Sequence, residues 1–210
     1  MGKLYQGMFG PVTGKVGDTV YYVLNGQNVA RHMGKRMEPF SEAQLGVQYR
    51  MKLVNVVLKT STEFLNVGFM SNLKWLKNSA YNRAVSYNLN NAITGIYPDC
   101  FIDFSKVLMS KGTLPVAIEV RMDPVAEGLQ FTWSSLDLPY PRGNDQAMLL
   151  AYFPSLGSAI YSVEAGCRSV GSALLPVPAD LLGERMEVYL SFVAADRKSV
   201  SDSVYLGRLN

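Results

Sequence analysis

The chain has 210 residues, 48% hydrophobic and 11% aromatic, which is enough to bury the core of one large domain or two small ones. No stretch approaches 18 uninterrupted apolar residues, and the first residues lack the apolar run of a secretory signal peptide. We therefore expect no membrane span, and a location in the cytoplasm or in a virion released by lysis.

The net charge of +3 is unevenly distributed. Residues 1–112 hold 13 Lys and Arg against 6 Asp and Glu, whereas residues 113–210 hold 7 against 11. Opposite charges on the two halves favour head-to-tail contacts between copies of the chain. Two unrelated solvated surfaces would give the same counts.

The N-terminal region predicts an irregular arm followed by a β-hairpin. Residues 2–14 contain four glycines and a proline, a density that breaks regular structure. Lys15–Leu24 is rich in strand-forming residues, Asn25-Gly26 is a type I′ turn signal, and Gln27–His32 forms the returning strand.

Two helices are predicted after a basic connector over residues 34–39. Ser41 and Gln44 form a capping-box pattern, and a helix is expected over residues 42–66, with Val47, Met51, Val54 and Leu58 on one face of a wide apolar surface. A second helix is expected over residues 78–92, with Gly95 at its C′ position.

The rest of the chain reads as extended structure. Residues 96–110 look extended, and strands are then expected at residues 116–122, 129–133, 147–153, 159–164, 173–177, 186–194 and 201–209. Pro176 suits an edge position. Seven short strands separated by turns are typical of a β-sandwich.

The sequence therefore predicts an α+β protein with two domains. Residues 1–112 would form a hairpin-plus-helices domain with a glycine-rich arm. Residues 113–210 would form an antiparallel β-sandwich.

The predicted sandwich resembles a fibronectin type III or immunoglobulin-like module. Trp133 ends the second strand, where such modules place a core tryptophan, and Val188, Leu190 and Phe192 form one face of the penultimate strand. Leu182-Gly183 is similar to the loop before a tyrosine corner, although Tyr189 falls on the alternate face.

The whole chain also resembles an uncharacterised family of similar length from Bacteroidota and their mobile elements. The residues that carry this likeness are Gly14-Lys-Val-Gly17, Asn25-Gly26, Val29, Arg31, Gln44, Arg50, Ile102–Val107, Trp133 and Val200–Tyr205. The resemblance implies two layered parts and no established activity.

No pattern of residues indicates catalysis, a metal or a cofactor. Cys100 and Cys167 have no zinc or disulfide-framework spacing. His32 is the single histidine and has no patterned nucleophile beside it, and Asp99 and Asp103 would lie about 13 Å apart along an extended segment. The glycines of residues 10–17 lack the Gly-Lys-Ser/Thr ending of a phosphate loop. We therefore expect a protein that is not an enzyme, with no cofactor.

Candidate interaction residues are basic and aromatic side chains of the first half. They are Lys15, Arg31, Lys35, Arg36, Lys74, Trp75, Lys77, Tyr81 and Arg83. Interleaved cations and aromatics can bind nucleic acid, but the net charge of this half is modest and no reader motif is present.

These observations favour a structural subunit of a larger assembly, such as a bacteriophage virion or phage-like particle. Its partners would be copies of itself or other assembly proteins. The alternatives are a soluble binding module for a protein or carbohydrate and, less favoured, a nucleic-acid-binding protein.

Overall fold

The computed structural model describes residues 2–4, 12–35, 38–70, 79–135 and 142–210. It divides into an N-terminal unit, Met1–Ser41, and a C-terminal unit, Glu42–Asn210. Within the described ranges, no helix is both long and apolar enough to cross a membrane. The predicted α+β fold, with an N-terminal hairpin, helices and an antiparallel sandwich, is confirmed.

The N-terminal unit is a small antiparallel sheet. Its strands are β1 (Gly2–Leu4), β2 (Gly14–Val16), β3 (Thr19–Leu24) and β4 (Gln27–His32), in the order β1-β4-β3-β2. The turn at Asn25-Gly26 is confirmed, with φ of 51° and 76° as a type I′ turn requires. Two details differ from expectation. The strand predicted from Lys15 onward is broken by a turn at Gly17-Asp18, and residues 2–4 of the predicted arm form a strand.

The predicted first helix is interrupted near its end. It consists of α1 (Glu42–Leu58), a 3-10 turn (Lys59–Ser61) and α2 (Thr62–Gly68). Val54 and Leu58 are buried as expected, but Val47 is 59% exposed and Met51 39% exposed. The wide apolar face of the sequence is therefore covered only along the second half of α1.

The second helix, α3 (Ala80–Asn91), begins at Ser79, whose side chain accepts a hydrogen bond from Asn82 N–H at 3.2 Å. It ends at Ala92, so Gly95 is not its C′ residue. Gly95, with φ of +90°, instead lies between the short strands β5 (Ile93–Thr94) and β6 (Phe101–Ile102), where a Cβ would approach the Asp99 carbonyl to 2.4 Å. A 3-10 turn, Phe104–Lys106, follows β6.

Over its described residues, the sandwich contains seven antiparallel strands in two sheets. The strands are β7 (Arg121–Val125), β8 (Gly128–Thr132), β9 (Gln146–Phe153), β10 (Ser158–Ser162), β11 (Ser172–Pro176), β12 (Met186–Val193) and β13 (Val204–Leu209). The sheet orders are β11-β8-β7 and β10-β9-β12-β13. Pro176 lies on an edge strand as predicted. The first strand lies later than expected, at residues 121–125, because the turn is Ala126-Glu127.

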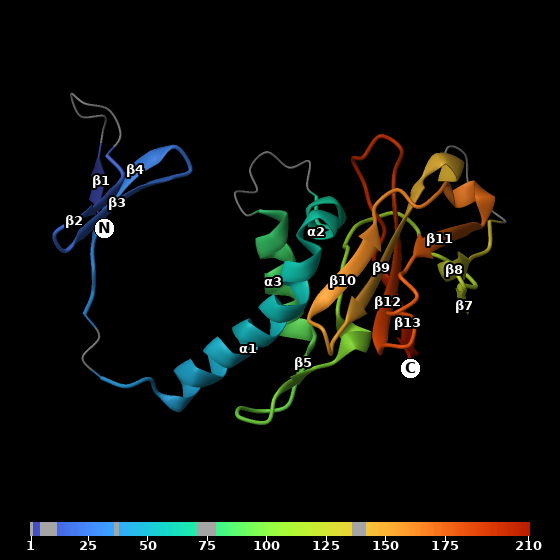
Figure 1. Ribbon diagram of the computed structural model, residues 1–210. Helices are drawn as coiled ribbons and strands as arrows, with labels where there is room; N and C mark the ends of the chain where they lie inside the picture. The colour runs from blue at the N-terminus through green and yellow to red at the C-terminus, as the bar shows by residue number, and fades with distance from the viewer. Residues whose placement is uncertain (1, 5–11, 36–37, 71–78, 136–141) are drawn as a thin grey trace. The chain divides into compact units, whose positions relative to one another are not determined.

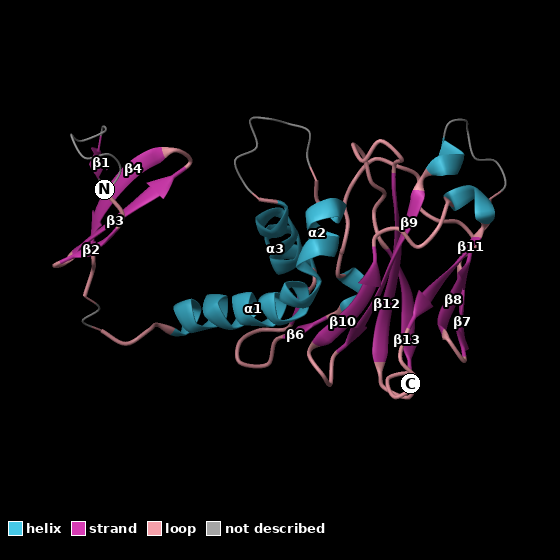
Figure 2. Ribbon diagram, turned by 45° about the horizontal axis from the view of Figure 1, so that its top comes forward, coloured by secondary structure: helices cyan, strands magenta, loops and turns pink. Residues whose placement is uncertain are grey.

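The C-terminal unit has three layers, with the four-stranded sheet in the middle (Figure 1, Figure 2). One face packs against the three-stranded sheet through side chains such as Leu149 and Leu190. The other face packs against the helices through Leu150 and Tyr189, among others. Strands β9 and β12 are therefore buried on both faces, as their nearly continuous apolar sequences require.

The predicted division at residues 112 and 113 falls inside the C-terminal unit. The segment just before it is hydrogen-bonded to the end of the sandwich: Ser110 Oγ donates to the Ser201 carbonyl at 2.7 Å, and Gly112 N–H donates to Asp202 Oδ1 at 2.9 Å. Lys111 N–H also donates to the carbonyl of Gly68 in α2 at 2.9 Å. Helices and sandwich therefore form one compact body.

Candidate functional site

The predicted interaction residues are distributed over both units. Lys15, Arg31 and Lys35 are exposed in the N-terminal unit. Tyr81 and Arg83 lie on α3, where the Tyr81 hydroxyl donates to Asn55 Oδ1 at 2.7 Å and the Arg83 guanidinium donates to the Phe69 carbonyl. Those two side chains thus connect parts of the helical layer. The remaining residues, Arg36, Lys74, Trp75 and Lys77, lie outside the described residues.

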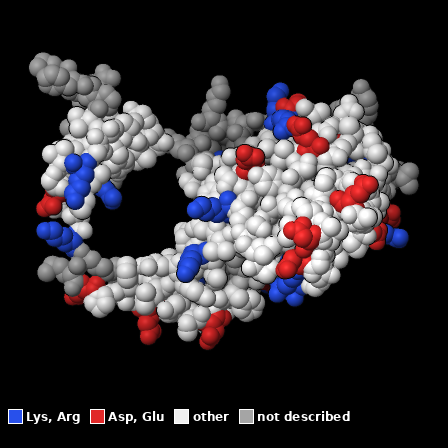
Figure 3. Space-filling view, viewed as in Figure 1, with Lys and Arg blue, Asp and Glu red and all other residues white. Residues whose placement is uncertain are grey.

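The register of the N-terminal sheet separates its charged side chains from its uncharged ones. Lys15, Val20 and Arg31 are paired across β2, β3 and β4, and the neighbouring pair Tyr22 and Val29 points to the same side. We call this set the basic face. The opposite face carries Val16, Thr19, Tyr21, Val23, Asn28, Ala30 and His32, none of which is a Lys, Arg, Asp or Glu. The space-filling view shows Lys and Arg on the N-terminal unit (Figure 3).

Among its described residues, the N-terminal sheet has almost no core of its own. Among residues 12–35, Val29 is the one buried side chain, at 4% exposure, whereas Val16 is 64% exposed and Leu24 is 50% exposed. Both hydrophobic clusters lie in the C-terminal unit. Small sheets need a packed hydrophobic face to be stable in water, and the described residues of this sheet provide little of one.

An acidic edge lies on the sandwich. Glu119, Asp123 and Glu127 are exposed on or beside β7, one of the two edge strands of the three-stranded sheet. No ion pair among the described residues involves these three carboxylates. The charge counts indicate an acidic C-terminal half but do not single out this edge. The feature of the sequence that marks it is the presence of three acidic residues within nine positions.

A shallow hollow of about 710 Å³ adjoins this edge. It is lined by Glu119, Val120, Arg121, Thr132, Trp133, Ser134 and Ser135. Its rim combines both charges with hydroxyl groups, so it could hold a small polar ligand.

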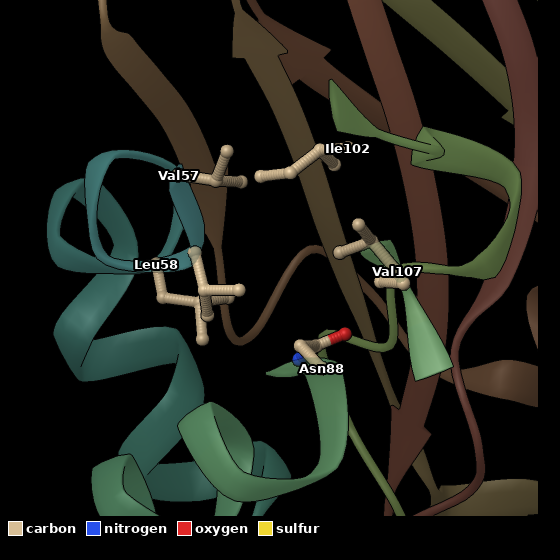
Figure 4. Close-up of a pocket in the computed structure, with 7 residues that line it drawn as sticks. Val57, Leu58, Asn88, Ile102 and Val107 are labelled. Atoms are coloured by element: carbon tan, nitrogen blue, oxygen red, sulfur yellow. The ribbon is translucent and has the colours of Figure 1, made fainter. Parts of the chain in front are cut away.

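A second, apolar pocket lies between the helices and the segment that follows α3 (Figure 4). Val57 and Leu58 of α1 face Ile102 and Val107 across it, and Asn88 of α3 closes one side (Figure 4). The space does not admit a water molecule, so the pocket is a packing junction and not a ligand site.

Glu187 is a fully buried carboxylate of the sandwich. Its Oε1 accepts hydrogen bonds from Arg185 at 3.1 Å and Arg208 at 3.0 Å, and its Oε2 accepts one from the Tyr205 hydroxyl at 2.5 Å. Burial, and then the hydrogen bond to Glu187, raises the pKa of Tyr205 to about 12. The cluster joins β12 to β13 and is a structural network.

The catalytic candidates considered from the sequence are not brought together. His32 is exposed at the end of β4. Asp103 accepts hydrogen bonds from Ser105 and pairs with Lys106 at 2.9 Å, and these contacts lower its pKa, whereas a general acid needs a raised one. Over the described ranges, no group of three His, Cys, Asp or Glu residues could hold a metal ion.

Residues 11–207 match the model of a family of unknown function, DUF6266. The chain belongs to this family. The family match includes β2, β3 and β4 of the N-terminal sheet as well as the helices and most of the sandwich. No curated protein in the comparison is similar to the chain.

Proposed function

We propose that this chain is a non-enzymatic structural subunit of a larger assembly, such as a bacteriophage virion or a phage-like particle. The observation that carries the proposal is the N-terminal sheet, which buries one described side chain among residues 12–35. A segment of this kind gains its stability by packing against a neighbour.

The sandwich provides the rigid part of such a subunit. We propose that it is a fibronectin type III or immunoglobulin-like module, supported by its sheets of three and four antiparallel strands and by Trp133 buried at the end of the second strand. Modules of this architecture often mediate contacts, although architecture alone does not determine function. A source among Bacteroidota and their mobile elements fits this proposal.

Light scattering coupled to size-exclusion chromatography tests the assembly. We expect the full chain to form oligomers at tens of micromolar and a chain starting at Glu42, which retains both hydrophobic clusters, to be a folded monomer. Deletion of residues 1–14 removes strand β1 and should weaken the oligomer. A full chain that stays monomeric at these concentrations would count against assembly from copies of itself. Portal, capsid or tail genes beside its gene would support the virion version.

A soluble binding module is the second candidate, because of the hollow beside Trp133. It predicts that a monomer binds a small polar or carbohydrate ligand at this hollow. A panel of glycans tested by calorimetry against the wild type and the Arg121→Ala variant would separate the two candidates. Binding that requires Arg121 in a monomeric protein would favour this alternative.

A further inference from the structure

The N-terminal unit and the sandwich carry matching patterns of charged and apolar side chains. On the basic face, Lys15 and Arg31 flank Val20, and their Cα atoms are about 10 Å apart, because two strand spacings separate them. On the acidic edge, Asp123 and Val125 point to one side of β7, as does Arg121 at its start, and Glu127 follows in the turn to β8. Val125 thus lies between the two acids, which are within about 13 Å of each other along the chain. Each surface is thus an apolar centre between two like charges.

Among the described residues of each unit, the charges on both surfaces have no ion-pair partner. No ion pair among the described residues includes Lys15, Arg31, Asp123 or Glu127. All four residues are exposed. The apolar residues between the acids are exposed as well, with Val125 at 39%.

We propose that the basic face of one copy docks on the acidic edge of the sandwich of a second copy, with Lys15 and Arg31 opposite Asp123 and Glu127. This inference rests on the proposed function, because it names the surfaces through which the assembly forms. Repetition of a head-to-tail contact of this kind gives a ring or a filament.

Two competing arrangements are less compatible with these residues. Two basic faces packed together would place like charges opposite each other, which is unfavourable. Addition of a strand to the edge of β7 is hindered by Pro124, which has no N–H group to donate. The contact is therefore made by side chains and not by continuation of the sheet.

Charge-reversal variants of the two surfaces test the proposed contact. Variant A carries Lys15→Glu and Arg31→Glu; variant B carries Asp123→Lys and Glu127→Lys. Sedimentation velocity of each variant alone should show association weakened about tenfold or more relative to the wild type, because attraction is replaced by repulsion. An equimolar mixture of A and B should regain association, since each then finds opposite charges on the other. That recovery also shows that both variants are folded.

The control variant carries Lys59→Glu and Asp180→Lys, which alter exposed charges outside both surfaces and should leave association unchanged. Higher salt should weaken wild-type association. If the wild type assembles and A and B assemble equally well, this docking is wrong while the proposed function stands. If the wild type is monomeric at tens of micromolar, this docking and assembly from copies of itself are both overturned. Variants that associate weakly alone and do not recover on mixing also overturn the docking.

Discussion

Trp133 donates a hydrogen bond from its Nε1 to the main-chain carbonyl of Arg168 at 2.8 Å. Both side chains pack on Phe192: the Trp133 ring lies edge-on at 5.4 Å between centroids, and the Arg168 guanidinium lies 4.1 Å from the ring centroid. Arg168 also donates to the carbonyls of Pro115 and Val116 at 2.8 and 3.0 Å. This buried cluster anchors the segment that enters the sandwich.

Replacement of Arg168 by Met should destabilise the protein by about 3–5 kcal/mol, because it leaves the buried Asp145 carboxylate, 3.7 Å away, without its cation. Urea unfolding followed by circular dichroism measures the loss. The matched control is Arg197→Met, which removes an exposed pair with Glu164 and should cost less than about 1 kcal/mol. Equal losses in the two variants would contradict a structural role for the buried pair.

Asn88 should contribute far more to the free energy of unfolding than its neighbours on α3 do. Its Nδ2 donates to the Leu108 carbonyl at 2.9 Å and its Oδ1 accepts from Leu108 N–H at 2.8 Å, inside the core. Asn88→Ala leaves both groups unsatisfied and should cost about 2–4 kcal/mol. Asn90→Ala, which loses only an exposed bond to the Ser86 carbonyl, is the control and should change the free energy of unfolding by less than about 0.5 kcal/mol. Thermal unfolding of the two variants distinguishes these sites.

Because of Tyr205, the free energy of unfolding should depend on pH in the alkaline range. Its pKa is about 12 in the folded protein and about 10 in an unfolded chain, so the neutral hydroxyl is the stabilising form. The stabilisation that the neutral Tyr205 hydroxyl gives to the folded protein is complete below pH 10 and is lost as the pH rises through 12.

Tyr205→Phe should therefore be less stable than the wild type at pH 8, and the difference should shrink between pH 10 and 12. Urea midpoints measured over this range check the expectation. If the urea midpoints of the two proteins change with pH in parallel, the hydrogen bond from Tyr205 to Glu187 is not coupled to the ionisation of Tyr205.

Gly112 should not tolerate a side chain. A Cβ at this position would lie 2.0 Å from the Val200 carbonyl, at the junction between the helical layer and the sandwich. Gly112→Ala should cost about 1–3 kcal/mol through overpacking. Gly183→Ala, where nothing lies within 4 Å, provides the comparison by differential scanning fluorimetry. A Gly112→Ala midpoint equal to that of Gly183→Ala would exclude this close contact.

The features that depend on neighbouring residues follow from the sequence. Asn25-Gly26 specifies a type I′ turn because both residues adopt positive φ easily. The strand and helix patterns predicted most of the elements, and Trp133 was correctly assigned to the core. Lys15 and Arg31 were identified as candidate contact residues from their type and position.

Which surfaces of the elements pack together depends on tertiary contacts. The apolar run of β9 indicates burial but does not say that Leu149 faces a sheet while Leu150 faces helices. The helices therefore join the sandwich, and the division of the chain lies after Ser41. Likewise, only the strand register places Lys15 and Arg31 on one face, because strand pairing brings together residues that are distant in sequence.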